Sequence, residues 1–176
     1  MITFVIDNRE HIKDKIKEVI PEAIFDNLLL GDYLFKIDSK PFLLIERKTI
    51  CDYAMSIKDG RNKEQKKRLL SNKEVNHILY LVEGDLTQDN SSFKYNKVNK
   101  QTIMSSIINT ILRDKINVFH TSSSEETIFV LNSIYNKLVK QKDSFLENKT
   151  TYTEDIINTV KMKKSDNITP EISLQM

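Results

Sequence analysis

Apolar, strand-like runs alternate with segments of helical periodicity along most of this chain, and this alternation constrains its fold more than any other feature. Runs rich in β-branched and aromatic residues predict strands at residues 2–6, 23–25, 33–37, 42–48, 77–82 and 116–120. Apolar residues three or four positions apart predict helices at residues 10–19, 49–57, 61–71, 99–112 and from 123 or 124 to about 141. This order of elements predicts an α/β domain with a central mixed sheet flanked by helices.

The composition fits one globular domain with a polar appendage. Of the 176 residues, 39% are hydrophobic and 30% are charged, a balance that allows a sizeable core. We predict that residues 1–141 form this domain, and that the polar, lysine-rich residues 142–176 form a linker or tail. Within the helix at 99–112, four isoleucines at helical spacing are expected to face the core: Ile103, Ile107, Ile108 and Ile111.

Charge, cysteine usage and hydropathy narrow the setting in which the protein works. The formal net charge of +2 is too small to indicate a polyanionic partner by itself. A single cysteine, Cys51, cannot form an intramolecular disulfide, which favours a reducing, intracellular compartment. Charged residues interrupt the first apolar run, so we expect no signal peptide. No apolar run approaches the roughly 20 residues that span a bilayer, so we expect no membrane partner.

Three charged side chains are predicted to meet at one end of a hairpin. Glu46 and Lys48 stand two positions apart at the end of an apolar strand, where period-two geometry puts both on the same face. Asp32 stands at the start of the preceding strand. In an antiparallel hairpin, the start of the first strand lies beside the end of the second. Asp32 is therefore expected to lie near Glu46 and Lys48.

This group of residues has the chemistry that phosphodiester hydrolysis needs. Carboxylate oxygens are the ligands that Mg²⁺ prefers, and Mn²⁺ takes the same type of ligand. Such a cation polarises a phosphoryl oxygen and lowers the pKa of a bound water molecule. A neighbouring lysine stabilises the negative charge of the transition state or orients the water. The pattern Asp…Glu-x-Lys is that of the PD-(D/E)xK nucleases, although Glu-x-Lys alone occurs by chance in many chains of this composition.

Longer motifs around these residues carry a family resemblance. The segment Glu46-Arg47-Lys48-Thr49-Ile50-Cys51-Asp52 resembles the ERKxxxD signature of the XPF/Hef family of structure-specific endonucleases. Further motifs of that family match in family order over residues 2–84: Ile6-Asp7-Asn8-Arg9-Glu10, Gly31-Asp32, Ser56-Ile57-Lys58-Asp59-Gly60-Arg61, Glu64-Gln65, Arg68-Leu69 and Leu79-Tyr80-Leu81-Val82-Glu83. The stretch from Asp59 to Lys66 is more similar to the Mus-type junction nucleases than to XPF itself.

The resemblance implies a restriction-endonuclease-like fold of the PD-(D/E)xK type and a role for each matching residue. The catalytic residues that it implies are Asp32, Glu46, Lys48 and Asp52. A Mg²⁺ or Mn²⁺ ion would be held by Asp32, Glu46 and Asp52, with Asp7 and Glu10 at the rim of its shell. DNA contacts are implied for Arg9, Arg47, Arg61, Gln65, Lys66 and Arg68, where the arginines contact phosphate or orient the carboxylates.

Partners are implied by the same resemblance. Members of the family cut branched DNA such as flaps, forks and nicked junctions, and work as homodimers or heterodimers through the last helices of the nuclease domain. Four apolar positions here are candidates for that contact, and core packing of an amphipathic helix explains them at least as well: Phe129, Ile134, Tyr135 and Leu138. Residues 160–171 are similar to the segment that leads into a helix-hairpin-helix domain in the family, and we expect that domain to be absent from this chain.

Each of these residues also has a structural explanation. Asp7 and Asp32 could end strands or cap turns, and the basic face formed by Lys63, Lys66, Lys67 and Arg68 could be a solvated helix surface. Three functions therefore stay open: an active endonuclease in DNA repair or recombination, a non-catalytic DNA-binding scaffold subunit of a nuclease dimer, and a PD-(D/E)xK enzyme acting on RNA or a small nucleotide. For DNA processing we expect the nucleus or the site of DNA replication, which for a viral protein is the viral factory.

Overall fold

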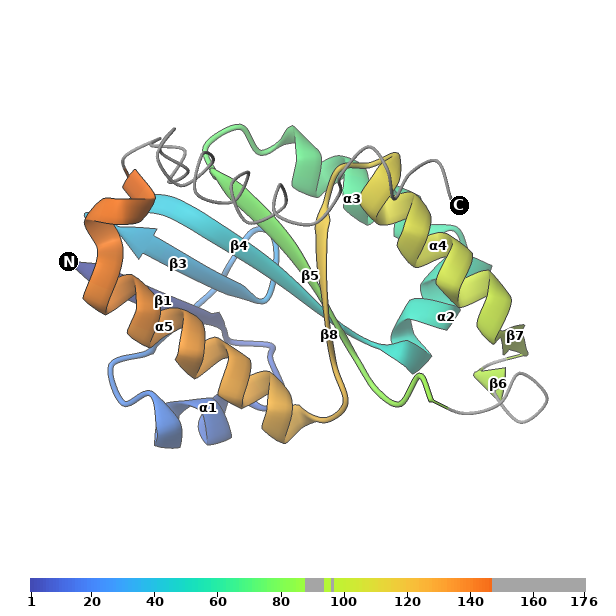
Figure 1. Cartoon of the computed structure of the whole chain (residues 1–176), viewed down its shortest axis with the longest axis horizontal. Helices are drawn as coiled ribbons and strands as arrows, with labels where there is room; N and C mark the ends of the chain where they lie inside the picture. The colour runs from blue at the N-terminus through green and yellow to red at the C-terminus, as the bar shows by residue number, and fades with distance from the viewer. Residues whose placement is uncertain (88–93, 96, 147–176) are drawn as a thin grey trace, which may run out of the picture. The chain divides into compact units, whose positions relative to one another are not determined.

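The computed structural model describes residues 1–87, 94–95 and 97–146. Residues 1–140 form one compact unit, and the described residues from Gln141 to Leu146 are not part of it. The strands of the first unit are β1 (Ile2–Asp7), β2 (Ile24–Asp26), β3 (Tyr33–Ile37), β4 (Lys40–Thr49), β5 (His77–Glu83), β6 (Lys94–Tyr95), β7 (Val98–Asn99) and β8 (Asn117–Thr121). Six of them form the central sheet, in the order β2-β1-β3-β4-β5-β8 (Figure 1), and β6 pairs with β7 in a small hairpin.

The central sheet is mixed, as the sequence predicts. β1 pairs with β2 in parallel and with β3 antiparallel, and β3 and β4 form an antiparallel hairpin. β4 then pairs in parallel with β5, and β5 with β8. β4, which carries Glu46, Arg47 and Lys48 near its end, therefore lies between β3 and β5, in the middle of the sheet.

Helices cover both faces of this sheet. They are α1 (Lys13–Val19), α2 (Ile50–Lys58), α3 (Arg61–Ser71), α4 (Lys100–Leu112) and α5 (Ser124–Leu146), of which α5 has a non-helical residue at Gln141. α1 and the part of α5 before Gln141 lie on one face, and α2, α3 and α4 lie on the other (Figure 1). Both the predicted strands and the predicted helices are confirmed, with the first helix beginning at Lys13 instead of residue 10.

Two apolar cores hold these layers to the sheet. On one face, Ile16 of α1 and Leu131 of α5 pack in the same cluster as Ile45 of β4. On the other face, Tyr53 of α2 packs in the same cluster as Leu44 of β4. Consecutive strand residues point to opposite faces, so Leu44 and Ile45 are buried in different cores. Burying such an aliphatic side chain contributes about 1.5–3 kcal/mol, which fixes β4 in register between the two helical layers.

The buried face of α4 differs from the sequence prediction. Ile103 is fully buried and Ile107 packs against the core, whereas Ile108 and Ile111 are 52% and 43% exposed. The buried stripe continues through Thr110, which is 0% exposed and accepts a hydrogen bond from Lys66. The prediction was wrong for Ile108 and Ile111, because the face of α4 that packs on the core includes Thr110 in their place.

The four apolar positions proposed for a dimer contact on α5 separate into two kinds. Leu138 is 3% exposed, and Ile134 and Tyr135 pack against the core of that face, which is the structural explanation given for them above. Phe129 is 71% exposed and belongs to neither core. Phe129 is therefore the one member of this group that projects from the compact unit. No helix in the described part of the chain is both long enough and apolar enough to span a membrane.

Candidate active site

Asp32 is fixed by backbone contacts between β1 and β4. Its amide donates to the carbonyl of Ile45 at 2.8 Å, and its carbonyl accepts from the amide of Asp7 at 2.8 Å. Its carboxylate accepts from the amide of Arg47 at 2.7 Å. The preceding Gly31 has a φ of +74°, and a Cβ at this position would lie 2.6 Å from Leu44 Cδ1. Only glycine fits this turn without strain, so the Gly-Asp pair aims the carboxylate at the end of β4.

Asp32 and Glu46 form a pair of neighbouring carboxylates. Burial first, and the charge of Glu46 second, raise the pKa of Asp32 to about 8. Burial also raises the pKa of Glu46, against the opposing effect of Lys48. Both groups line one hollow of about 220 Å³, which we call the Asp32 hollow, together with Arg9, Gln65 and Arg68. Two carboxylates that repel each other at a partly buried site favour a bound proton or a bound cation.

Lys48 lies in an adjoining hollow of about 350 Å³, the Lys48 hollow. Glu46 and Gln65 line both hollows, so the lysine is next to the carboxylate pair. The Lys48 ammonium donates to the side-chain oxygen of Gln65 and to Ser56 Oγ at 3.4 Å. Its Nζ also lies 5.9 Å and 5.8 Å from the ring centroids of Tyr53 and Tyr80. Burial is the main cause that lowers the pKa of Lys48, and the charge of Glu46 opposes it.

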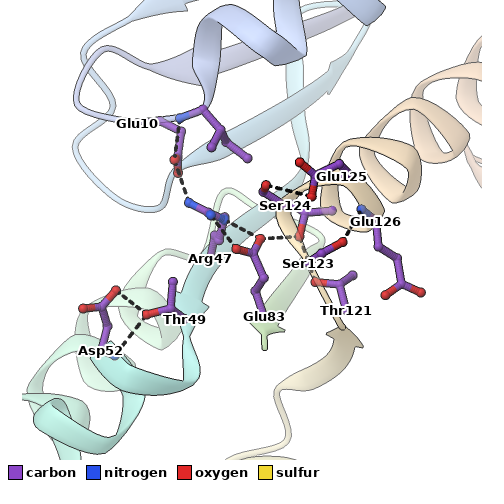
Figure 2. A network of polar contacts seen from close by, with 12 residues as sticks. Glu10, Arg47, Thr49, Asp52, Glu83, Thr121, Ser123, Ser124, Glu125 and Glu126 are labelled. Carbon is purple, nitrogen blue, oxygen red and sulfur yellow. Dashed lines mark hydrogen bonds and ion pairs between the residues drawn. The ribbon is translucent and has the colours of Figure 1, made fainter. Parts of the chain in front are cut away.

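Asp52 lies at the start of α2, at the edge of the Lys48 hollow. Its amide donates to Thr49 Oγ1 at 3.1 Å, and that hydroxyl donates to Asp52 Oδ2 at 2.7 Å (Figure 2). Thr49 thereby caps the helix, and the carboxylate is exposed to solvent. Asp52 and Lys48 line the same hollow, but the hydrogen bonds between Asp52 and Thr49 at the helix start explain the position of Asp52 without a metal ion.

Asp7 supports a loop at the mouth of the site. It is 1% exposed, and its carboxylate accepts from Arg9 Nε at 2.7 Å and from the amide of Leu28 at 2.8 Å. The hydrogen bond from the Arg9 side chain is the largest of the causes that lower the pKa of Asp7 to about 2. Arg9 Nη2 also donates to the Leu28 carbonyl at 2.9 Å. The two residues thus hold the chain between β2 and β3, and the carboxylate of Asp7 is fully engaged there.

Glu10 belongs to a network on the opposite side of β4 from Lys48. Arg47 Nη1 donates to Glu10 at 2.9 Å, while Arg47 Nε and Nη2 donate to the two oxygens of Glu83 at 2.9 and 2.7 Å (Figure 2). Thr127 of α5 donates to Glu83 at 2.6 Å. Because the Arg47 side chain is only 11% exposed, it orients carboxylates and does not face solvent. The family resemblance implies two possible roles for Arg47, contact with phosphate or orientation of carboxylates. Its geometry matches the second role, orientation of carboxylates.

Sequence reasoning missed Glu83 and Thr127, which complete this network. Glu83 ends β5 directly beside Thr49 of β4 in the parallel register. The available signal was the position of Glu83 at the end of a buried strand, next to the strand that carries the signature. Thr127 gave no such signal, because its contact depends on how α5 packs against the sheet.

The residues predicted to bind DNA are distributed unevenly around the two hollows. Arg61 pairs with Asp59 and lines the Lys48 hollow, and Arg68 pairs with Glu64 and lines the Asp32 hollow; both arginines are exposed. Lys66 points inward: its side chain is 6% exposed, and its ammonium binds Asp114 at 2.9 Å. This geometry argues against the phosphate contact that the sequence predicts for Lys66, because its ammonium group is buried between α3 and α4 and is already paired with Asp114.

Of the five carboxylates predicted to hold a metal ion, the structure brings Asp32 and Glu46 into one hollow. Asp7 and Glu10 are engaged by arginines, and Asp52 binds Thr49. Within residues 1–87, 94–95 and 97–146, no group of three or more His, Cys, Asp or Glu side chains is arranged to hold a metal ion. A two-carboxylate site still suits Mg²⁺, which is commonly bound through one or two carboxylates with water and substrate phosphate completing the shell.

The sequence of the chain is similar to those of several known proteins. Residues 6–134 match the model of the ERCC4 domain family. The ERCC4 domain-containing protein EP364R of African swine fever virus (strain Badajoz 1971 Vero-adapted) is 27% identical over 170 residues, covering 88% of this chain and 47% of the viral protein. The probable crossover junction endonuclease mus81 of Dictyostelium discoideum is 31% identical over 156 residues, covering 74% of this chain and 17% of that protein. The chain thus spans about half the length of the viral relatives that it matches.

Solved structures agree with the fold. XPF from Aeropyrum pernix aligns with a TM-score of 0.62 and 26% identity, covering 82% of this chain and 68% of that chain. The same protein in complex with DNA aligns with a TM-score of 0.63 and 24% identity, covering 80% and 66%. These likenesses confirm the restriction-endonuclease-like fold, in which a mixed sheet is flanked by helices.

Proposed function

The chain belongs to the ERCC4 domain family, the XPF family of nucleases, and from this premise we propose that it is a metal-dependent endonuclease that hydrolyses phosphodiester bonds in branched DNA. The observation that carries the proposal is the meeting of Asp32 and Glu46 in one hollow, with Lys48 in the next. The names of related proteins add support: two relatives are named crossover junction endonucleases, and one structural neighbour is an XPF in complex with DNA.

Asp32 and Glu46 are the residues that would hold a Mg²⁺ or Mn²⁺ ion. Their raised pKa values reflect two carboxylates whose negative charges are costly in a partly buried site, and a divalent cation removes that cost. When bound, such a cation polarises the phosphoryl oxygen and supplies an activated water molecule. Asp52, Asp7 and Glu10 would act from outside this pair, because their carboxylates are held by Thr49, Arg9 and Arg47.

Lys48 would stabilise the charge that develops on the phosphoryl group. Its ammonium is held by Gln65, and the faces of Tyr53 and Tyr80 lie near it, so little reorganisation is needed at the moment of reaction. Gln65 comes from α3 and lines both hollows, which makes it a positioning residue for Lys48. Arg61 and Arg68 at the rims, and Arg9 at the mouth, would contact the phosphates on either side of the cut bond.

The partners and location follow from the same proposal. Contacts to phosphate carry no base information, so the protein would recognise the shape of flaps, forks or nicked junctions. A second ERCC4-type subunit, identical or different, would pack on α5 through the exposed Phe129. We propose that the protein acts where DNA is repaired, recombined or replicated, in the nucleus or, if the protein is viral like some of its relatives, in a viral factory.

The test measures cleavage of a panel of labelled DNA substrates by the wild-type protein and by variants of Glu46 and Lys48. We expect the wild-type protein to nick flap and nicked-junction substrates with Mg²⁺ and to be inactive with EDTA. Glu46→Gln and Lys48→Met should each lower the rate by about a hundredfold or more, because each removes a charge that the transition state uses. The control Glu18→Gln makes the same charge change as Glu46→Gln on the exposed surface of α1.

Three outcomes would contradict the proposal. Undiminished nicking by Glu46→Gln protein would remove the assigned site, and binding of branched DNA without any cleavage in Mg²⁺ or Mn²⁺ would favour a scaffold subunit. RNA and small cyclic nucleotides belong in the same panel. Preferential hydrolysis of either would assign the same site to a different phosphodiester.

A further inference from the structure

One leucine at the rim of the Asp32 hollow is almost completely exposed. Leu29 lies in the loop between β2 and β3, lines the hollow and is 99% exposed. Among the large apolar side chains in the described part of the chain, the next most exposed are those of Met1 at 74% and Phe129 at 71%. Single exposed apolar residues are common on protein surfaces and need no explanation by themselves. What distinguishes Leu29 is its place, at the edge of the hollow that contains Asp32 and Glu46.

The loop holds Leu29 in this position from both sides. On one side, the amide of Leu28 donates to the Asp7 carboxylate at 2.8 Å, and its carbonyl accepts from Arg9 Nη2 at 2.9 Å. On the other side, the side chain of Leu30 packs against the apolar core under α2 and α3. The buried carboxylate of Asp7 therefore fixes the backbone that presents Leu29 to solvent. A side chain on a backbone that is already fixed loses less conformational entropy when it contacts a ligand.

The neighbours of Leu29 at this rim are exposed arginines. Arg9 and Arg68 line the same hollow, and their side chains are 75% and 66% exposed. Such charges suit the phosphates of a DNA strand that enters the hollow. The side chain of Leu29 has neither a charge nor a hydrogen-bonding group, so a phosphate gains nothing from it. The part of a nucleotide that suits an apolar side chain is the face of its base.

Base faces are open to such a contact where a duplex is interrupted. In a continuous duplex each base pair is covered by its neighbours, and an apolar side chain reaches a base face only by unstacking a step, which costs free energy. At a flap or fork that stacking is already interrupted, and the last base pair of an arm has one open face. Covering this face removes apolar area from water without the cost of unstacking. An apolar residue beside the cleavage site thus favours branched over continuous DNA.

We propose that Leu29 contacts the open base face at the branch point of the DNA substrate, and that this contact makes the protein prefer branched over continuous DNA. This inference rests on the proposed function and names the residue by which the same site would recognise a branch. Arg9 and Arg68 would bind the backbone of any DNA, whereas the contact of Leu29 depends on DNA structure. Because Leu29 lines one hollow with Asp32 and Glu46, the contact would also set the distance between the branch and the cut bond.

The experiment compares the binding of two fluorescent DNAs of matched length, a flap and a continuous duplex, in EDTA so that no cleavage occurs. The test variant is Leu29→Ser. The matched control is Leu112→Ser, which makes the same change at a leucine of α4 that is 64% exposed and outside the Asp32 hollow. We expect the ratio of flap affinity to duplex affinity to fall by about tenfold in Leu29→Ser, as for the loss of one apolar side-chain contact, with duplex affinity unchanged. Leu112→Ser should keep the wild-type ratio, and Leu29→Met, which retains an apolar side chain, should keep most of it.

Two further measurements test the chemistry and the place of the contact. The slope of log K against log salt should be the same for the wild type and Leu29→Ser, because the substitution removes no charge. Single abasic sites are then placed in turn at the positions around the branch of the flap DNA. One position should weaken binding by the wild type without weakening binding by Leu29→Ser, because both changes remove the same contact.

Several results would overturn the branch contact. These are an equal loss of flap and duplex affinity in Leu29→Ser, a loss of preference in Leu112→Ser as large as that in Leu29→Ser, and an abasic profile that is identical for the wild type and Leu29→Ser. A shift from dimer to monomer in Leu29→Ser, measured by light scattering, would also overturn it, because Leu29 would then belong to a subunit interface. Cleavage by the wild type and by Glu46→Gln is measured separately and reports on the nuclease proposal alone. A lowered ratio in Leu29→Ser would support the branch contact even if the wild type cleaved no DNA.

Discussion

At the scale of single residues, neighbouring charges decide which carboxylates are available for chemistry. Asp7 and Asp32 each lie beside an arginine in sequence or space, yet the pKa of Asp7 is lowered and the pKa of Asp32 is raised. Asp7 receives both the side chain and the amide of Arg9, whereas the neighbour that most affects Asp32 is the like charge of Glu46. The first carboxylate therefore has a structural role in holding a loop, and the second is the one whose charge a cation would compensate.

Replacement of Asp7 tests its loop-holding role. The pKa of Asp7 is lowered to about 2 from an ordinary 3.8, chiefly by the hydrogen bond from Arg9. Its ionised form therefore stabilises the fold fully above about pH 4, and this contribution is lost as the pH falls through about 2. We expect Asp7→Asn to lower the free energy of unfolding by about 1.5–3 kcal/mol at pH 7.

Urea denaturation followed by circular dichroism suits the measurement, since the chain has no tryptophan. The difference in the free energy of unfolding between the wild type and Asp7→Asn should become smaller between pH 4 and pH 2. The exposed Glu22→Gln serves as the control, with little change at pH 7. A deficit that is the same at pH 2 and at pH 7 would argue against the ion pair as its source.

At the scale of elements, α3 joins the candidate site to the helical layer behind it. Gln65 on α3 contacts Lys48, and the next residue, Lys66, binds Asp114 beyond the end of α4. Arg68 lies one turn further on, at the rim of the Asp32 hollow. Because consecutive helix residues point in directions about 100° apart, one short helix serves the site, the interior and the surface with neighbouring residues.

The Lys66–Asp114 pair should be a strong link between α3 and α4. Its side chains are 6% and 14% exposed, so truncating Asp114 would leave a buried ammonium group with no compensating charge. We expect Asp114→Ala to cost about 3–5 kcal/mol of stability, and the apolar pair Lys66→Met/Asp114→Leu to recover most of it. Thermal and urea denaturation measure both effects.

A surface ion pair on the same helix provides the comparison. Glu64 and Arg68 are 63% and 66% exposed at i,i+4 spacing, and Glu64→Gln should cost less than about 1 kcal/mol. If Asp114→Ala cost no more than Glu64→Gln, the buried pair would not be what joins the two helices.

At the scale of the whole molecule, the ionised carboxylate of Asp32 lowers the stability of the compact unit of residues 1–140. With the pKa of Asp32 raised to about 8 from an ordinary 3.8, the folded protein binds a proton more tightly than the unfolded chain. The stability of the metal-free protein should therefore fall as the pH rises from about 4 toward about 8. A ligand that binds only the folded state reverses this loss by mass action.

Added Mg²⁺ should accordingly raise the Tm at pH 8. A concentration one hundred times the Kd contributes about 2.7 kcal/mol, which corresponds to a rise of roughly 5–10 °C for a unit of this size. Asp32→Asn should have a higher Tm than the wild type without metal and should not respond to Mg²⁺. An equal rise for Asp32→Asn, measured by the same thermal scan, would place the cation elsewhere.

The elements and the central residues of the candidate site can be predicted from the sequence alone, because both follow from local rules. Period-two geometry in β4 and the register of one hairpin are enough to bring Asp32, Glu46 and Lys48 together, and no distant contact is needed. Gln65 comes close to Lys48 for a similar reason, since α3 follows α2 after a two-residue turn.

The contacts of the remaining charged residues depend on the three-dimensional packing and could not be predicted from the sequence. Lys66 turns inward because Asp114, distant in sequence, lies opposite it, and Arg47 binds Glu83 because β5 pairs beside β4. Ile108 and Ile111 are exposed, while Thr110 on the buried face of α4 binds Lys66 of α3. Sequence periodicity gives the faces of an element, but the choice of neighbour depends on how layers pack. That packing determines which charged side chains are buried in ion pairs and which are exposed and able to contact a substrate.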